Sequence, residues 1–196
     1  MKKILCNCVV LCFASLVFLN KAASQNFVNW VGGVSTDYFN ANNWSDNTMV
    51  FSNMNNNYLT IGAGNPNNCL LVGGNASNVA YRPGRLNVAS NGIFTCNGAV
   101  YPNSSDSLNG TVTINSAADF NNRNILYIGN KANCNLTING GKLSSKNGVF
   151  IATGTGGSAT VTLNGGNLNV GGGGVNMDLS IANAAGLTGL LNIYGG

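Results

Sequence analysis

A short phrase that recurs in the second half of the chain constrains the fold more than any other feature. Its copies are Val112–Asn115, Leu136–Asn139 and Val161–Asn164, and a related copy starts at Leu191. The last residues of successive copies are 24, 25 and 30 positions apart. A phrase that returns at this spacing is typical of a repeat architecture, in which each copy forms one structural unit.

Each repeat contains three strand-like pieces separated by turns. In the first piece apolar and polar residues alternate, which places the two sets on opposite faces of a strand. Asn-Gly-Gly follows this piece in two copies, and both residue types tolerate the positive φ of a sharp turn. The second pieces are 142–144 and 167–170, and the third pieces are 126–130, 149–153 and 179–183.

Three strands and three turns within 24 to 30 residues leave no room for a helix of ordinary length. The repeats therefore predict an all-β, right-handed parallel β-helix with 24–30 residues per coil and coils about 4.8 Å apart. An antiparallel sandwich or barrel would not explain why the same phrase recurs in the same order. We expect small residues (Gly129, Ala152, Ala182) at one corner and an amide ladder of Asn115, Asn139 and Asn164 at another. The expected internal apolar ladder is Val112, Ile114, Leu136, Ile138, Val161 and Leu163.

The chain divides into four parts by composition. Residues 1–24 begin with Lys2 and Lys3, continue with an apolar run and end in a small-residue site, and this pattern predicts a secretory signal peptide cleaved before Gln25. An uncleaved membrane anchor is the alternative, although the apolar run is short for a span. We interpret residues 25–50 as an aromatic cap, 51–109 as irregular early coils and 110–196 as the regular β-helix.

The charge and the rare residue types exclude several classes of function. Residues 25–196 carry six basic and five acidic residues, so their net charge of +1 does not favour nucleic-acid binding. The chain has no His and no Cys pair at zinc-site spacing, so we expect no metal and no cofactor. No segment of the mature chain is expected to cross a membrane. Among Cys69, Cys96 and Cys134, one disulfide is possible in an oxidising compartment, and Cys134 is best interpreted as a buried apolar residue.

Trp30 and Trp44 are the best candidates for a binding role. Exposed indoles can stack on sugar rings, and the Asn-rich surface could bind sugar hydroxyl groups. The simpler interpretation is that both residues, with Phe39, cover the open end of the first coil. The sequence favours the cap and leaves carbohydrate binding as an alternative.

The repeats resemble those of secreted bacterial β-helix proteins, namely autotransporter passengers and surface adhesins that carry sorting domains. The residues that carry the resemblance are 135–143, 159–168 and 151–158, together with an opening of Trp30–Gly33 and Asn42–Ser45. The resemblance implies a secreted or bacterial cell-surface protein, with glycans or host-surface components as partners. Members of this group run through many coils to a sorting or translocator domain. The chain stops at Gly195–Gly196 in mid-phrase, so we expect an N-terminal fragment.

A catalytic role is the weakest hypothesis. Glycoside hydrolysis generally needs two carboxylates at a fixed separation. The chain has no Glu, and none of its five Asp residues shares a repeat-equivalent position with another. The prediction is a structural, adhesin-like β-solenoid without enzymatic activity, with carbohydrate binding at Trp30 and Trp44 as the alternative. A polysaccharide-degrading β-helix enzyme ranks last.

Overall fold

The computed structural model describes residues 24–48, 51, 54–62, 64–73, 82–172, 178–182 and 185–194. The predicted signal peptide, apart from Ser24, lies outside the described residues, as do the two glycines that end the last repeat copy. The described residues form β-strands joined by turns, with one short 3-10 helix, η1 (Ala41–Asn43). None of the described helices is long and apolar enough to span a bilayer.

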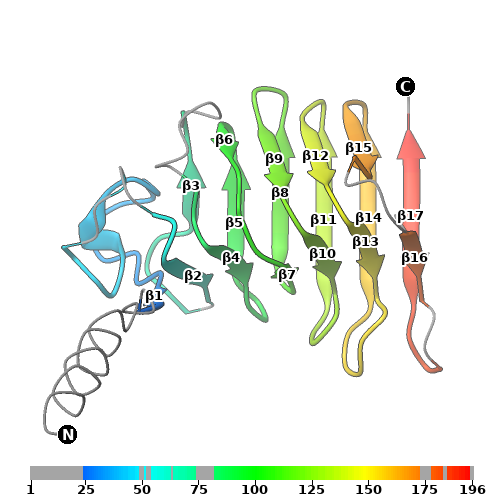
Figure 1. Cartoon of the computed structure of the whole chain (residues 1–196), viewed down its shortest axis with the longest axis horizontal. Helices are drawn as coiled ribbons and strands as arrows, with labels where there is room; N and C mark the ends of the chain where they lie inside the picture. The colour runs from blue at the N-terminus through cyan, green and yellow to red at the C-terminus, as the bar shows by residue number, and fades with distance from the viewer. Residues whose placement is uncertain are drawn as a thin grey trace, which may run out of the picture.

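The strands form three parallel sheets that run along the length of a solenoid (Figure 1). In the order in which they pair, the seven-stranded sheet holds β1 (Asn26–Asn29), β2 (Asn57–Ile61), β4 (Arg85–Val88), β7 (Asp106–Leu108), β10 (Ile125–Ile128), β13 (Gly148–Ile151) and β16 (Asp178–Ile181). The six-stranded sheet holds β3 (Cys69–Leu71), β5 (Ile93–Cys96), β8 (Thr111–Asn115), β11 (Cys134–Asn139), β14 (Ala159–Asn164) and β17 (Gly189–Tyr194). The four-stranded sheet holds β6 (Ala99–Val100), β9 (Asp119–Asn122), β12 (Lys142–Ser145) and β15 (Asn167–Val170).

From β4 onward the chain visits the seven-, six- and four-stranded sheets in turn and then repeats the cycle. Leu136 of β11 aligns in parallel with Val112 of β8 on one side and with Val161 of β14 on the other. This register confirms the parallel β-helix and excludes the antiparallel sandwich. The coil from Phe94 to Val112 takes only 18 residues and is shorter than the regular repeats. It contains β6 and β7, which are two and three residues long.

The predicted apolar ladder forms the core of the solenoid. Its residues in β8 and β11 are at most 1% exposed, and so is Val161, whereas Leu163 is partly buried. The three cysteines of the described chain are buried and free, which confirms the interpretation of Cys134. Burial raises the pKa of Cys96 and Cys134 to about 12, so neither thiol ionises readily at neutral pH.

The last strands of the solenoid expose residues that are covered in earlier coils. Leu179 and Ile181 of β16 are 45% and 38% exposed, whereas their partners Val149 and Ile151 in β13 are fully buried. The difference arises because β16 and β17 are the terminal strands of their sheets, with a paired strand on one side only.

The corner after the seven-stranded sheet requires small residues, as the sequence predicted. Gly129, Ala152 and Ala182 occupy it with φ values of 67°, 51° and 48°, the left-handed region that most side chains avoid. A Cβ atom on Gly129 would lie 2.6 Å from the Cβ of Ala159 on the next turn of the chain. The small residues therefore allow the backbone to turn tightly and to approach the neighbouring coil.

Among the described glycines, Gly98 makes the tightest approach to another backbone, which gives a testable prediction. A Cβ atom there would lie 1.8 Å from the carbonyl oxygen of Gly73, whereas one on Gly62 would have nothing within 4 Å. Gly98→Ala should therefore destabilise the protein by about 1–3 kcal/mol, measured by urea unfolding. The matched Gly62→Ala variant should unfold like the wild type, and equal stability of the two variants would contradict the close approach.

Candidate functional site

An N-terminal aromatic cluster lies at the beginning of the solenoid. The rings of Trp30 and Trp44 meet edge to face with centroids 5.1 Å apart, and the two residues also form an isolated antiparallel bridge. Tyr38 packs edge to face on Trp44 and lies 6.5 Å from Phe94 of β5, centroid to centroid. The cluster therefore joins the segment between β1 and β2 to the core of the six-stranded sheet. Its members are Trp30, Tyr38, Phe39, Trp44 and Phe51.

Both indole N–H groups are satisfied by backbone carbonyl groups. Trp30 Nε1 donates to the oxygen of Asn67 at 2.8 Å, and Trp44 Nε1 donates to the oxygen of Tyr38 at 2.8 Å. Trp30 and Trp44 are 3% and 1% exposed. Sugar stacking needs an exposed ring face, and the hollow beside Trp30 has a volume of only about 40 Å³. This is room for a water molecule, so the geometry supports the cap.

Asn43 holds the cap segment together, a role that the sequence analysis missed. Its side chain is fully buried. Its Oδ1 accepts from the backbone N–H groups of Val34 and Ser35, and its Nδ2 donates to the hydroxyl of Ser35 and the carbonyl of Asp37. A buried amide with every group paired fixes a single loop conformation, because an unpaired group would be costly there.

The predicted amide ladder exists and is one step longer than expected. Asn164 Nδ2 donates to Asn139 Oδ1 at 3.1 Å, and Asn139 Nδ2 donates to Asn115 Oδ1 at 3.4 Å. Asn115 Nδ2 in turn donates to Asn97 Oδ1 at 2.6 Å. The parallel register aligns Phe94–Asn97 with the phrase Val112–Asn115, but Phe94 and Cys96 replace its aliphatic residues, which explains why the sequence did not reveal this copy.

The ladder gives a prediction for Asn139, which bonds to neighbours on both sides. Asn139→Ala removes two side-chain hydrogen bonds, but the groups that it leaves behind lie near solvent and can bond to water. We therefore expect a loss of about 1 kcal/mol in the free energy of unfolding, measured by urea titration. Asn135→Ala, which removes an exposed amide from the same strand, should cost less. If Asn135→Ala lowered the free energy of unfolding more than Asn139→Ala, the ladder would not be what stabilises this face.

The outer face of the six-stranded sheet carries a row of hydroxyl groups beside this ladder. Threonine occupies the same outward position in four successive coils, and an asparagine continues the row in the fifth. Neighbouring members are separated by the strand spacing of about 4.8 Å. The row consists of Thr95, Thr113, Thr137, Thr162 and Asn192.

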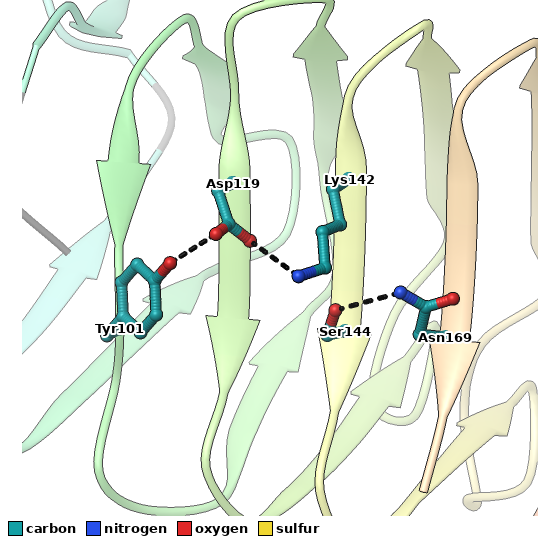
Figure 2. Close-up of polar contacts among 5 residues, drawn as sticks. All are labelled: Tyr101, Asp119, Lys142, Ser144 and Asn169. Carbon is teal, nitrogen blue, oxygen red and sulfur yellow. Dashed lines mark hydrogen bonds and ion pairs between the residues drawn. The ribbon is translucent and has the colours of Figure 1, made fainter. Parts of the chain in front are cut away.

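The outer face of the four-stranded sheet is polar and partly charged (Figure 2). The hydroxyl of Tyr101 donates to a carboxylate oxygen of Asp119, and the other oxygen lies 3.9 Å from Lys142 Nζ. Asn169 Nδ2 donates to the hydroxyl of Ser144 at 3.5 Å. Figure 2 shows these side chains on one side of neighbouring strands, where the parallel register places them.

A groove with a volume of about 310 Å³ crosses this face. Its basic residues are Arg123, Lys142 and Lys146, and its neutral polar side chains come from β9, β12 and β15. The glycine that follows β15, Gly171, takes φ 117° and leaves no side chain beside Lys146. We refer to this feature as the β12 groove, and its lining residues are Asn121, Arg123, Lys142, Ser144, Ser145, Lys146, Asn169, Gly171 and Gly172.

Residues of the β12 groove lie at shared register positions of successive coils, which the sequence analysis did not identify. Asp119, Lys142 and Asn167 occupy one register position, and Asn121, Ser144 and Asn169 occupy the next outward one. The residue types change from coil to coil, so the positions do not read as a motif. Their shared place becomes evident only when the strands are aligned.

Asp106 is the most perturbed carboxyl group among the described residues. It points into the solenoid from β7, is 1% exposed, and accepts hydrogen bonds at 2.9 Å from the Leu86 N–H group and from Asn122 Nδ2. Burial raises the pKa of Asp106 to about 8, although these two hydrogen bonds and the charge of Arg85 oppose the shift. A carboxyl group that is buried in this way and paired with neighbouring strands is a structural element of the core.

The described residues hold no group of three potential metal-binding side chains. Their carboxyl groups are also dispersed, since Asp106 is buried in one sheet and Asp119 is engaged by Tyr101 in another. The arrangement that remains is one of hydrogen-bonding and charged groups repeated on successive coils. Such a surface can bind a ligand through hydrogen bonds and charge.

No family model, curated protein or solved structure matches this chain. The parallel β-helix therefore rests on the strand register and on the repeats themselves.

Proposed function

We propose that this protein is a secreted or cell-surface structural protein of the adhesin type, without catalytic activity. The observation that supports this most is the continuous outer face of the six-stranded sheet. There the threonine row and the amide ladder run side by side over successive coils. A rigid rod with a regular polar face suits a stalk or a contact surface, because each coil adds the same groups in register.

The extracellular location is supported by the N-terminal segment. Lys2 and Lys3, the apolar run up to Leu19 and the small residues before Gln25 follow the order of a secretory signal. Glycans or host-surface components are the partners that we propose for such a protein. The resemblance to surface β-helix proteins also suggests further coils and a C-terminal sorting or translocator domain. These proposals go beyond the observed β-solenoid fold, and each can be tested directly.

The location can be tested by expressing the full chain in a bacterial host and separating the cellular fractions. We expect the protein outside the cytoplasm, with a mature N-terminus at Gln25. Replacing Lys2 and Lys3 with Glu should retain the chain inside the cell. Full-length, unprocessed protein in the cytoplasm of the wild-type strain would contradict the proposal.

The absence of catalysis can be tested with the same secreted protein. We expect no new reducing ends and no unsaturated products when it is incubated with a panel of neutral and acidic polysaccharides. Turnover that is lost on replacing Asp119 with Asn would restore the enzyme hypothesis. Binding without turnover would agree with a structural protein that contacts its surroundings.

A further inference from the structure

We propose that the β12 groove binds a carboxylate-bearing polysaccharide that runs along the solenoid axis. The inference builds on the proposed extracellular function and names a ligand class and a site for it. The site lies on the four-stranded sheet, away from the two tryptophans that the sequence singled out.

The first support is the distribution of charge along the mature chain. All six of its basic residues fall between Arg82 and Lys146, whereas Asp37 and Asp46 lie in the cap segment and Asp178 lies in β16. The central coils therefore carry most of the positive charge, although the net charge of residues 25–196 is only +1. Three of these six residues line the β12 groove. Positive charge collected in one cleft attracts an anionic ligand.

The second support is how the three basic side chains of the groove are paired and spaced. Lys142 lies near Asp119, and Arg123 Nη1 donates to Asn103 Oδ1 at 3.2 Å. Lys146 is exposed, and its ammonium group makes no hydrogen bond or ion pair with the described residues. Arg123 and Lys146 occupy equivalent positions one coil apart, directly after the ends of β9 and β12. An arginine and a lysine at this spacing can each bind a carboxylate of one ligand.

The third support is the row of neutral groups beside the cations. Asn121, Ser144 and Asn169 share one register position on three successive strands. Ser144 is 9% exposed and forms part of the groove floor, where its hydroxyl meets the Asn169 amide. Amides and hydroxyls can donate to and accept from sugar hydroxyl groups. Because the coils repeat about every 4.8 Å, the row suits a polymer with its own regular repeat.

The same observations argue against nucleic acid as the ligand. Binding to a phosphate backbone relies on many neutralised phosphates, and the groove offers three cations. Single-stranded nucleic acids also stack their bases on aromatic side chains. No aromatic residue lines the groove. An acidic polysaccharide needs fewer charges and more hydrogen-bonding groups, which the groove provides.

The proposal can be tested by affinity electrophoresis and calorimetry with the full secreted chain. Polygalacturonate and alginate serve as acidic probes, and dextran serves as a neutral one. We expect binding to both acidic polymers and none to dextran. Arg123→Gln and Lys146→Gln should each weaken binding about tenfold, as expected for the loss of a charge-assisted contact. Both variants should keep the wild-type urea midpoint, because both side chains are exposed.

Lys131→Gln is the matched control, since it removes one exposed positive charge from the turn after β10. It should bind the acidic polymers like the wild type. If Lys131→Gln weakened binding as much as Arg123→Gln and Lys146→Gln, the net charge of the protein would determine the affinity. That result would contradict a binding site in the β12 groove. Failure of the wild type to bind either acidic polymer, or equal affinity for duplex DNA, would also overturn the proposal. Cytoplasmic retention of the chain would contradict the proposed function and leave the binding result intact.

Discussion

Trp44→Ala is expected to destabilise the protein by about 3–5 kcal/mol, measured as the free energy of unfolding in urea. Trp44 is 1% exposed, packs edge to face on two other rings, and bonds through its indole N–H group to the backbone. Its removal leaves a cavity and an unpaired carbonyl group at the end of the solenoid. The first coils should then lose their cover and exchange backbone amide protons faster than the coils around β11.

Phe27→Ala is the control for this prediction. Phe27 lies in β1, close to the same end of the solenoid, but it is 69% exposed, and its ring meets that of Tyr58 edge to face. Its removal should change the free energy of unfolding by less than about 1 kcal/mol. A Trp44→Ala protein with wild-type stability that no longer bound a glycan would contradict the cap. That result would restore the carbohydrate-binding hypothesis.

The stability of the protein should fall as the pH rises from about 4 to about 8. Burial raises the pKa of Asp106 to about 8 from the ordinary value of about 4 for an aspartate side chain. Between these values the folded state holds a proton that the unfolded state releases, so increasing pH favours unfolding. The contribution is fully present below pH 4 and is lost above pH 8. It amounts to several kcal/mol, at about 1.4 kcal/mol for each pH unit that separates the two pKa values.

Asp106→Asn should make the stability profile flatter across this range. The amide can still accept from the Leu86 N–H group, but its nitrogen cannot accept from Asn122, so we expect a loss of about 1 kcal/mol at pH 4. At pH 9 the variant should be more stable than the wild type, and urea titrations at several pH values would show the crossing. Asp46→Asn is the control, because hydrogen bonds from Thr48 and Asn26 lower the pKa of that exposed carboxyl group. Parallel profiles for the wild type and Asp106→Asn would contradict the buried proton.

Much of the fold was predictable because the repeats are local. Alternation with a period of two decides which residues of β8, β11 and β14 face inward, and the strand register confirms each of them. The spacing of the copies also placed the amide ladder and the small corner residues correctly. Stacking identical phrases in register is the arrangement that buries every apolar row at once.

The surface sites were harder to predict, because they depend on residues that do not repeat. Lys142 and Lys146 look like isolated charges in the sequence and meet Arg123 only when β9 and β12 pair. Asp106 takes a position that an apolar residue, Leu126, fills in the next coil. Its burial follows from the register, and nothing in its local sequence distinguishes it from an exposed turn residue.

The sequence by itself determined the coil, because an alternating phrase that returns at a nearly constant interval can bury its apolar residues only by stacking on its own copies. The tertiary structure decided which side chains share a surface. It placed the two tryptophans inside the cap and gathered three cations into one groove. Such neighbours come from different coils, and the lengths of the turns between strands set the register that brings them together.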